Sequence, residues 1–325
     1  MIDRRGFHRM TAGAVAATLS GGAVFAQDKY PSRPVRFIVA VAAGGPNDIY
    51  ARLLGQWLTD RLGQPFVIEN RPGAGTNLAT EFVVRSPADG YTIVTVAPSQ
   101  TVNATLYSNL KYNFLRDIAP VASFARQAQV LVVHPSVPVN TVAELIDYAK
   151  KNPGKLNYGS AGIGTGPHMA AELFKLMAGV DIVHVPYRGA SLATQDTLSG
   201  QVQMTLTAVS GLGDLISTGK LKALGVSTSQ RSELLPDVPT IGETVPGYES
   251  SALFGVGAPA GTPREIINLL NREINNALRD PGIRKKMDDL GGGVFISTPE
   301  EYGKILAEDT EKYGRIVRVT GAKVE

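Results

Sequence analysis

Segments with the composition of β-strands alternate along this chain with segments whose apolar residues recur at helical spacing. Val35–Val41 is rich in β-branched residues, and Ile49–Leu62 follows it with a helical pattern and Gly63 as a stop. The second half repeats this order, with Leu156–Gly159 followed by a helix from about His168 to Met177. Strands that alternate with helices predict an α/β fold with mostly parallel sheets.

The chain has 325 residues, a length that favours two lobes over one. Further predicted strands are Phe66–Glu69, Thr92–Ala97, Gln129–His134, Ile182–Val185, Val202–Leu206 and Ala223–Ser227. Further predicted helices are Asn77–Ser86, Val142–Lys151, Pro263–Arg279 and Pro299–Thr320.

The N-terminal segment has the features of an export signal. Its residues Asp3-Arg4-Arg5-Gly6-Phe7 resemble a twin-arginine signal, and a weakly apolar run from Met10 to Ala26 follows. That run is too short and too rich in glycine for a membrane-spanning helix. We therefore predict a signal peptide over residues 1–26, cleaved near Ala26/Gln27, and a periplasmic location. The twin-arginine and general secretory routes both stay open.

Composition excludes several classes of function. The chain contains no cysteine, which excludes disulfides, thiol catalysis, thiolate metal sites and a lipid-modified cysteine anchor. The formal net charge is only +3, and the basic N-terminus supplies most of it, so no nucleic-acid surface is expected. No histidine or carboxylate pattern indicates a metal, and no G-x-S-x-G motif indicates a nucleophile. Ser99 and Ser160 have no neighbouring base in the sequence. We expect no catalytic residues, no metal and no cofactor.

The turn after the first predicted strand favours an anion site. It lacks the third glycine of a dinucleotide fingerprint and the G-K-[ST] of a phosphate loop. We expect Asn47 or Asp48 to cap the helix that follows, and the free N–H groups of its first turn to attract a small carboxylate. An ordinary tight turn with a capping aspartate stays an equal alternative. The candidate residues are Ala43, Gly44, Gly45, Asn47 and Asp48.

A second glycine-rich turn precedes the helix near His168. Pro167 stands in its first helical turn, where the missing N–H costs nothing. It too lacks the residues of a nucleotide site, so we interpret it as a second helix N-terminus for an anion. His168 is a possible donor, although a single histidine is more often structural. The candidate residues are Ser160, Ala161, Gly164, Thr165 and His168.

Other candidates follow predicted strands, at the edge where parallel sheets bind ligands. Ser99, Gln100 and Thr101 follow Thr92–Ala97, and Tyr187 follows Ile182–Val185. An ordinary turn and a packing tyrosine are the alternatives.

Several longer stretches together resemble one family, the Bug-type solute-binding proteins of tripartite tricarboxylate transporters. The resemblance runs from Tyr30 to about Gly321. Besides the Gly44–Asp48 turn, it rests on Tyr30–Pro34, Leu62–Pro65, Glu69–Gly75, Pro87–Thr92, Asn152–Tyr158, Val183–Tyr187, Leu235–Thr240 and Ala258–Pro263.

The resemblance implies a two-lobed α/β protein of the type II, or Venus flytrap, class, each lobe a mostly parallel sheet flanked by helices. It implies that residues 27–124 and 255–325 form lobe 1, and that residues 125–254 form lobe 2 as an insertion. The ligand carboxylate would lie between the two glycine-rich turns, held by backbone amides and bridging waters. The closed form would be recognised by a membrane permease with large and small subunits. The protein itself would be a monomer without enzymatic activity.

Departures from the family pattern bear on the ligand. Ala40-Val41-Ala42-Ala43 replaces a usual aromatic residue and prolines, and Pro46-Asn47 replaces a common Gly-Thr. Gln203 and Thr207 stand where acidic residues are frequent. Since Thr207 cannot pair with an ammonium group, we expect a ligand without one, such as a dicarboxylate or an aromatic acid.

Two other functions stay open on the sequence. A sensor that signals to a membrane kinase would have the same cleft, so the residues do not separate it from a transport protein. A periplasmic enzyme that acts on a carboxylic acid is the less favoured alternative.

Overall fold

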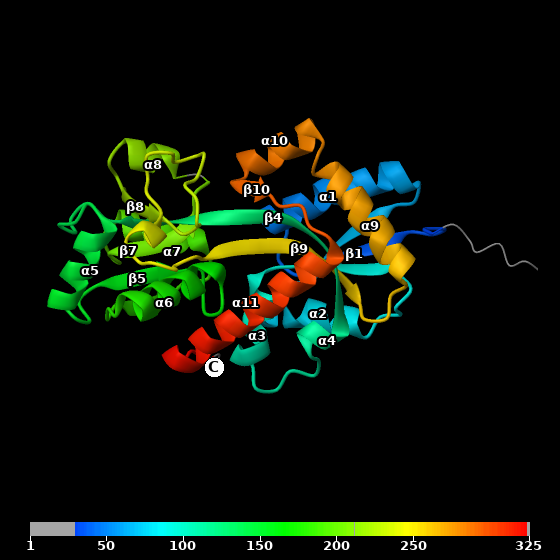
Figure 1. Cartoon of the computed structure of the whole chain (residues 1–325), viewed down its shortest axis with the longest axis horizontal. Coiled ribbons are helices and arrows are strands. Elements are labelled where there is room, and N and C mark those ends of the chain that lie inside the picture. Colours follow the sequence, from blue (N-terminus) through cyan, green and yellow to red (C-terminus); the bar gives the residue numbers. More distant parts are fainter. Residues whose placement is uncertain (1–29, 211, 324–325) are drawn as a thin grey trace, which may run out of the picture.

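The computed structural model describes residues 30–210 and 212–323, which form two α/β lobes side by side (Figure 1). The predicted signal peptide lies outside the described residues. The first lobe contains a six-stranded sheet. Its strands, in spatial order, are β2 (Phe66–Asn70), β1 (Val35–Val39), β3 (Thr92–Val96), β9 (Ser251–Pro259), β4 (Ile118–Val133) and β10 (Gly292–Val294).

The second lobe is built on the far half of β4. There β4 pairs with two antiparallel strands, and two further strands continue the sheet in parallel. The strands, in spatial order, are β8 (Lys222–Val226), β4, β7 (Met204–Ala208), β5 (Asn157–Ser160) and β6 (Val183–Pro186).

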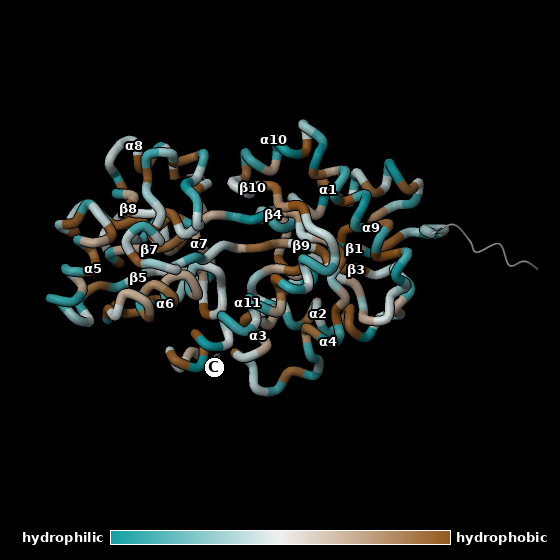
Figure 2. Tube along the Cα trace, in the orientation of Figure 1, coloured by the Kyte–Doolittle hydropathy of each residue, from teal (hydrophilic) through white to brown (hydrophobic). Residues whose placement is uncertain are grey.

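Helices cover both faces of each sheet. In the first lobe α1 (Pro46–Leu62), α9 (Arg264–Ala277) and α10 (Pro281–Asp289) share one apolar core, whereas α2 (Asn77–Val84), α4 (Phe114–Asp117) and part of α11 (Pro299–Thr320) share another. In the second lobe α5 (Val142–Lys151) and α6 (Gly166–Ala178) cover one face. The other face carries α8 (Gly213–Ser217), with α7 (Ala190–Leu198) packed on β5 and β7. Figure 2 shows β9 as largely hydrophobic and the outer helix α10 as largely hydrophilic.

Two elements connect the lobes beyond the crossing strands. The C-terminal half of α11 and the helix α3 (Pro98–Leu106) contribute Tyr313, Val317, Val102 and Leu106 to the core of the second lobe. Short 3₁₀ turns, η1 (Ala74–Thr76) and η2 (Ile241–Glu243), complete the elements. Because α11 packs against both α3 and α6, it spans the junction between the lobes (Figure 1).

The predicted α/β class and the two lobes are confirmed, and the sheet is mixed rather than mostly parallel. The parallel strands β1–β3 and β5–β7 lie outside a central group in which β4, β9 and β10 run antiparallel to their neighbours. Antiparallel pairing follows because β4 leaves the first lobe and β9 returns to it.

Glycine at position 255 of β9 is required by close packing. A Cβ there would lie about 2.4 Å from Cζ of Tyr302 and 2.5 Å from the carbonyl oxygen of Ala122. We expect Gly255→Ala to lower the free energy of unfolding by about 2 kcal/mol, since backbone cannot move aside easily. Urea denaturation measures this. Gly213→Ala, whose Cβ would meet no atom within 4 Å, is the control, and equal midpoints for the two variants would refute the packing argument.

Candidate ligand-binding site

The turn between β1 and α1 leaves open space beside its glycines. A Cβ on Gly44 or Gly45 would meet no heavy atom within 4 Å, and Gly44 has a φ of +92°. The helix begins at Pro46 with Gly45 as its N-cap and no capping side chain. The expected cap at Asn47 or Asp48 is therefore wrong: Asp48 is the third helical residue and reaches back to accept the Gly44 N–H at 2.9 Å. Alanine 43 is exposed on the same turn.

Asp48 holds this turn in place rather than facing outward. Its side chain is almost fully buried and also accepts hydrogen bonds from Arg52, at 3.0 Å, and from Asn70, at 2.8 Å. Asn70 in turn donates to the carbonyl of Val41. Burial alone raises the pKa of Asp48, but the hydrogen bonds from Arg52, Gly44 and Asn70 outweigh it and hold the pKa below its ordinary value. The carboxylate is thus a structural anion that orders the turn.

Asn47 places an unsatisfied amide between the ends of β1 and β3. It is 5% exposed, and its Nδ2 lies 3.4 Å from Oγ1 of Thr95, which also accepts the Ala40 N–H. Its Oδ1 is buried without a hydrogen-bond partner among the described residues. Since rotation about the terminal torsion exchanges the two amide atoms, either can face a ligand.

The first turn of α3 carries the predicted Ser99, Gln100 and Thr101. Gln100 is fully engaged: its Oε1 accepts the Ala97 N–H at 2.9 Å, and its Nε2 donates to the Thr95 carbonyl. Thr101 donates to the Pro98 carbonyl at 2.7 Å. The Ser99 hydroxyl lies 3.3 Å from that of Thr76 on η1. The geometry therefore favours Ser99 over Gln100 and Thr101 as a ligand contact.

The turn between β2 and α2 also belongs to this edge, although none of its residues is among the predicted ligand contacts. Ala74 and Thr76 both have positive φ, +45° and +84°, which is strained for residues with a Cβ. Asn103 of α3 supports the turn by donating to the Gly75 carbonyl at 2.6 Å. Backbone strain of this kind is frequent at functional sites. The sequence does carry a signal for this unusual backbone, the alternating glycines within residues 73–76.

The second glycine-rich turn lies between β5 and α6. Ser160 is fully buried and accepts the Gly162 N–H at 3.1 Å, while Thr165 is the N-cap of α6 and donates to the Gly162 carbonyl. Ala161 is half-buried. At Gly164, with a φ of +78°, a Cβ would lie 2.7 Å from Leu106 of α3. This turn of the second lobe thus packs directly on a helix of the first lobe.

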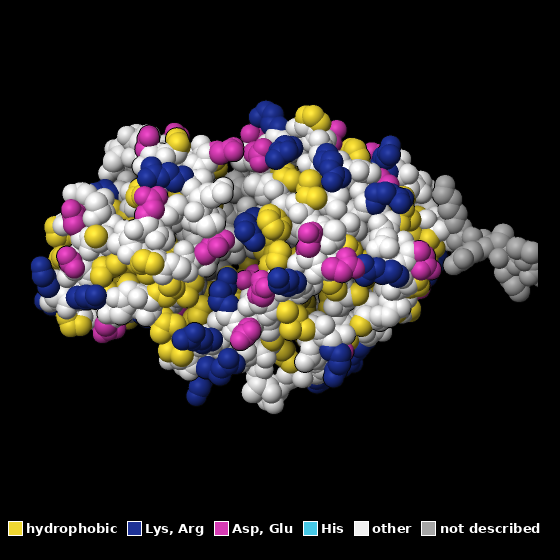
Figure 3. Space-filling model, viewed as in Figure 1, with side chains coloured by type: hydrophobic (Ala, Val, Ile, Leu, Met, Phe, Trp, Pro, Cys, Tyr) yellow, Lys and Arg dark blue, Asp and Glu magenta, His cyan; other side chains and the backbone are white. Residues whose placement is uncertain are grey.

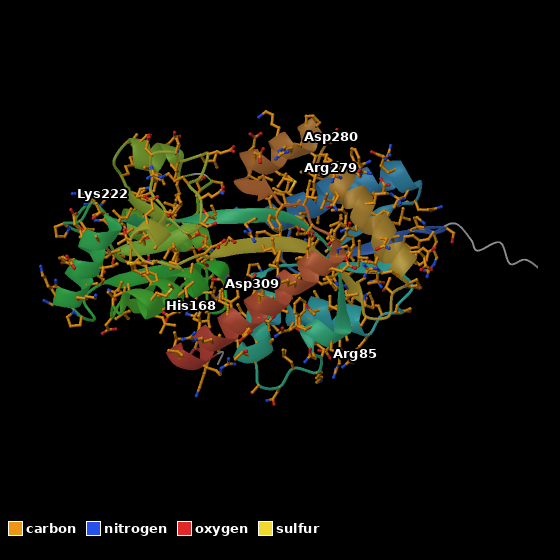
Figure 4. The ribbon with its side chains drawn as sticks, in the orientation of Figure 1. Arg85, His168, Lys222, Arg279, Asp280 and Asp309 are labelled. Carbon is orange, nitrogen blue, oxygen red and sulfur yellow. The ribbon has the colours of Figure 1, made fainter. Side chains whose placement is uncertain are left out.

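Two stacked histidines support that turn from within the second lobe. His168, on α6 (Figure 4), accepts the Gly164 N–H at its Nδ1, at 3.2 Å. His184 on β6 stacks on it at 4.2 Å, and its Nε2 lies 2.6 Å from the Ser160 hydroxyl. Burial lowers the pKa of His168 to about 3 and that of His184 to about 4. Both rings are therefore neutral near pH 7, and His168 orders the turn by accepting a backbone N–H.

Ser160 has no base beside it in the sequence, but the fold brings the ring of His184 next to its hydroxyl. Ser160 and His184 lie on the neighbouring strands β5 and β6, which pair so that Tyr158 is opposite His184. The serine is fully buried and also bonds within its own turn, which favours a structural role over that of a nucleophile. The hydroxyl of Tyr158 donates to Glu172 at 2.6 Å, and the Lys175 ammonium donates to the same carboxylate oxygen at 2.8 Å.

Of the remaining predicted residues, Tyr187 follows β6 and adjoins the same turn, since its N–H donates to the Ser160 carbonyl at 3.0 Å. The Tyr187 hydroxyl donates to Asp196 of α7 at 2.8 Å, and burial with this bond raises its pKa to about 12. Thr207 is buried on β7 opposite Val130 of β4. Gln203 precedes β7, at the opposite end of that strand from Thr207, and is bonded to Asn157 and Gly200.

A separate cavity of about 510 Å³ lies between the lobes and contains none of the predicted residues. Arg126 and Ala128 of β4 line it, and side chains alternate along a strand, so it lies on the face of β4 opposite Gln129. Loop 228–234 of the second lobe and α10 of the first lobe form its sides. On the face in Figure 3 basic and acidic side chains are intermixed, as they are in this cavity.

Within residues 30–210 and 212–323, no group of three or more histidine or carboxylate side chains is placed to hold a metal ion. In the same residues, every helix is too short or too polar to cross a membrane.

A chain with two α/β lobes joined by crossing strands, and with helix N-termini at the edges where the lobes meet, has the fold of a two-lobed periplasmic binding protein. Residues 50–322 match the family described as the tripartite tricarboxylate transporter family receptor. The chain belongs to this family.

Relatives agree with this membership over nearly the whole chain. Protein BugT of Bordetella pertussis is 35% identical over 316 residues, which cover 96% of this chain and 97% of BugT. The structure of Rpa4515 from R. palustris with adipate has a TM-score of 0.78 and 35% identity, covering 90% of this chain and 98% of that one. MatC from Rhodopseudomonas palustris with bound malate has a TM-score of 0.74 and 30% identity, covering 89% and 100%.

Proposed function

We propose that the protein binds a small carboxylate between its lobes in the periplasm and delivers it to a tripartite tricarboxylate-type permease. The observation that carries this proposal is the pair of helix N-termini at α1 and α6, each behind a glycine turn. The free N–H groups of a first helical turn and the helix dipole favour a carboxylate at such a place. The adipate and malate held by two relatives support an acid ligand.

Closure of the lobes would couple binding to delivery. The turn at Gly164 lies against α3, so a ligand between the turns would touch both lobes and favour the closed state by its differential affinity. We propose that the protein acts as a monomer without catalytic activity. Permease subunits would distinguish the closed form from the open one.

The lobe boundaries remain part of the proposal, as residues 27–124 with 255–325 and residues 125–254. The pairing of β4 supports a crossing a few residues inside these bounds, because β4 changes partner from β9 to β7 between Ala128 and Gln129. The return crossing lies beside it, where the Ser250 N–H donates to the Ser227 carbonyl.

Acids without an amino group should bind more tightly than amino acids of the same length. Thr207 and the neutral Asn47 offer no carboxylate for an ammonium group, and burying an unpaired charge is costly. In a thermal-shift panel, an acid such as adipate or malate at 100 times its dissociation constant should add about 2.7 kcal/mol, a rise of about 5 °C. Aspartate and glutamate are the matched controls. Tighter binding of these amino acids would contradict the proposed ligand class, and no binding of any acid would contradict the function.

A further inference from the structure

Gln129 lies at the point where β4 crosses from one lobe to the other. Its backbone is fixed there, since its N–H donates to Oγ of Ser227 at 3.0 Å and its carbonyl accepts the Ser227 N–H at 2.8 Å. In the ladder with β7 it is opposite Ala208, the neighbour of Thr207. The residue is therefore held rigidly between the lobes.

The Gln129 side chain is buried against the N-terminus of α6. It is 3% exposed, and its Nε2 lies 3.0 Å from the position that a Cβ on Gly166 would occupy. Gly166 is the first helical residue and Pro167, the second, has no N–H. A glycine at this position thus allows the amide to approach the helix end directly.

The amide of Gln129 is not satisfied by the described residues around it. Its Oε1 is buried without a hydrogen-bond partner among them. A buried amide group without a partner destabilises a fold, so such a group usually has a ligand, a water or a functional reason. Nearby Gln127, two residues earlier on the same face of β4, differs in that its Nε2 reaches the Leu290 carbonyl at 3.4 Å.

The N-terminus of α6 determines which kind of ligand group is stable beside this amide. The first-turn N–H groups and the positive end of the helix dipole favour an anion oxygen. An oxygen at that place accepts hydrogen bonds, so the amide must present its nitrogen to it. The two amide atoms are interchangeable by a rotation of the terminal torsion, which permits this orientation.

We propose that Gln129 is a direct ligand contact, whose amide nitrogen donates to a carboxylate oxygen at the N-terminus of α6. This inference rests on the proposed function and extends it, because it makes the crossing strand part of the site. A ligand held by β4, α6 and the α1 turn is tied to both lobes and to the strand that connects them. Gln129 therefore favours an acceptor oxygen at this end of the ligand.

The test compares Gln129→Leu with the wild type. Leucine has nearly the same volume and no polar atom, so it removes the donor and the unsatisfied amide together. We expect adipate or malate, whichever the wild type binds, to bind at least about tenfold more weakly by calorimetry. The melting midpoint of the ligand-free variant should be unchanged or higher. Gln129→Glu should weaken binding further, since its carboxylate repels that of the ligand.

Gln127→Leu is the matched control, because it removes an amide that does have a partner. It should lower the ligand-free midpoint and leave the affinity within about twofold. The inference is overturned if Gln129→Leu binds the acid as tightly as the wild type, or if it lowers the ligand-free midpoint as Gln127→Leu does. A wild type that binds none of the acids would instead refute the proposed function.

Discussion

Asp48→Ala should weaken acid binding by about 30-fold and lower the free energy of unfolding by about 3 kcal/mol. The carboxylate is 2% exposed and accepts hydrogen bonds from Gly44, Arg52 and Asn70. Alanine would leave the Gly44 N–H and one N–H of the Asn70 amide without an acceptor, while the other Asn70 N–H keeps the Val41 carbonyl. Arg52 is half exposed and can rehydrate, so most of the loss comes from the two neutral donors.

The loss of affinity has a separate physical cause. Asp48 joins the glycine turn to β2 through Asn70 and to its own helix through Arg52, so its removal releases the turn that precedes α1. A ligand would then have to order the turn again on binding, which costs free energy.

Urea denaturation and calorimetry measure the two effects of Asp48→Ala. Asp48→Asn should be intermediate, since its oxygen can still accept the Gly44 N–H while the charge is lost. Asp60→Ala, on the exposed side of the same helix, is the control and should change both quantities little. If Asp48→Ala unfolded at the same urea concentration as Asp60→Ala, the structural role of Asp48 would be disproved.

Several regular elements could be predicted from the sequence, but β9 and the part of β4 before Gln129 could not. Helical periodicity places α1, α5 and α11 within a few residues of their observed bounds. The first twelve of the 16 residues of β4 are IAPVASFARQAQ, with a proline and few β-branched residues, and β9 contains two glycines. These segments are strands because they pair at the centre of the sheet, where tertiary contacts override local preference.

The two glycine-rich turns before α1 and α6 could also be predicted, because glycines before a helix are a local signal. The direction of each side chain could not. Gln100 bonds to its own turn, and His184 meets Ser160 only because β5 and β6 pair in one particular register. Gln129 stands in a predicted strand, and only the crossing of β4 places its amide beside α6. Such contacts join residues that are distant in sequence, so local patterns carry no signal for them.

The second large effect that we expect is a loss of stability as the pH falls from 7 to 5. Burial lowers the pKa of His168 to about 3 and of His184 to about 4, whereas an unfolded histidine has a pKa near 6.5. Below pH 6.5 the unfolded chain therefore binds protons that the folded chain does not. Stability is fully present above that pH and declines with falling pH until the folded pKa values are reached.

The expected size follows from the two rings and their surroundings. One buried neutral histidine contributes up to about 1.4 kcal/mol for each pH unit in this window. His184 is partly exposed and faces Glu172, which favours its charged form, while Lys175 opposes the charged form of both rings. The contribution of His184 is therefore smaller than that of a fully buried histidine. We expect a total loss of about 2–3 kcal/mol in the free energy of unfolding between pH 7 and pH 5, before most carboxylates are protonated.

A double variant, His168→Asn with His184→Gln, separates this titration from the other charges. The Asn oxygen can accept the Gly164 N–H and the Gln oxygen can accept the Ser160 hydroxyl, but neither side chain can be protonated in this range. Urea midpoints measured from pH 7 to pH 5 should fall in the wild type and stay nearly level in the variant. Equal slopes in the two proteins would show that the histidines do not control the acid stability. A steeper fall of ligand affinity than of stability in the wild type alone would show that protonation first releases the 160–165 turn, because both rings bond directly to that turn.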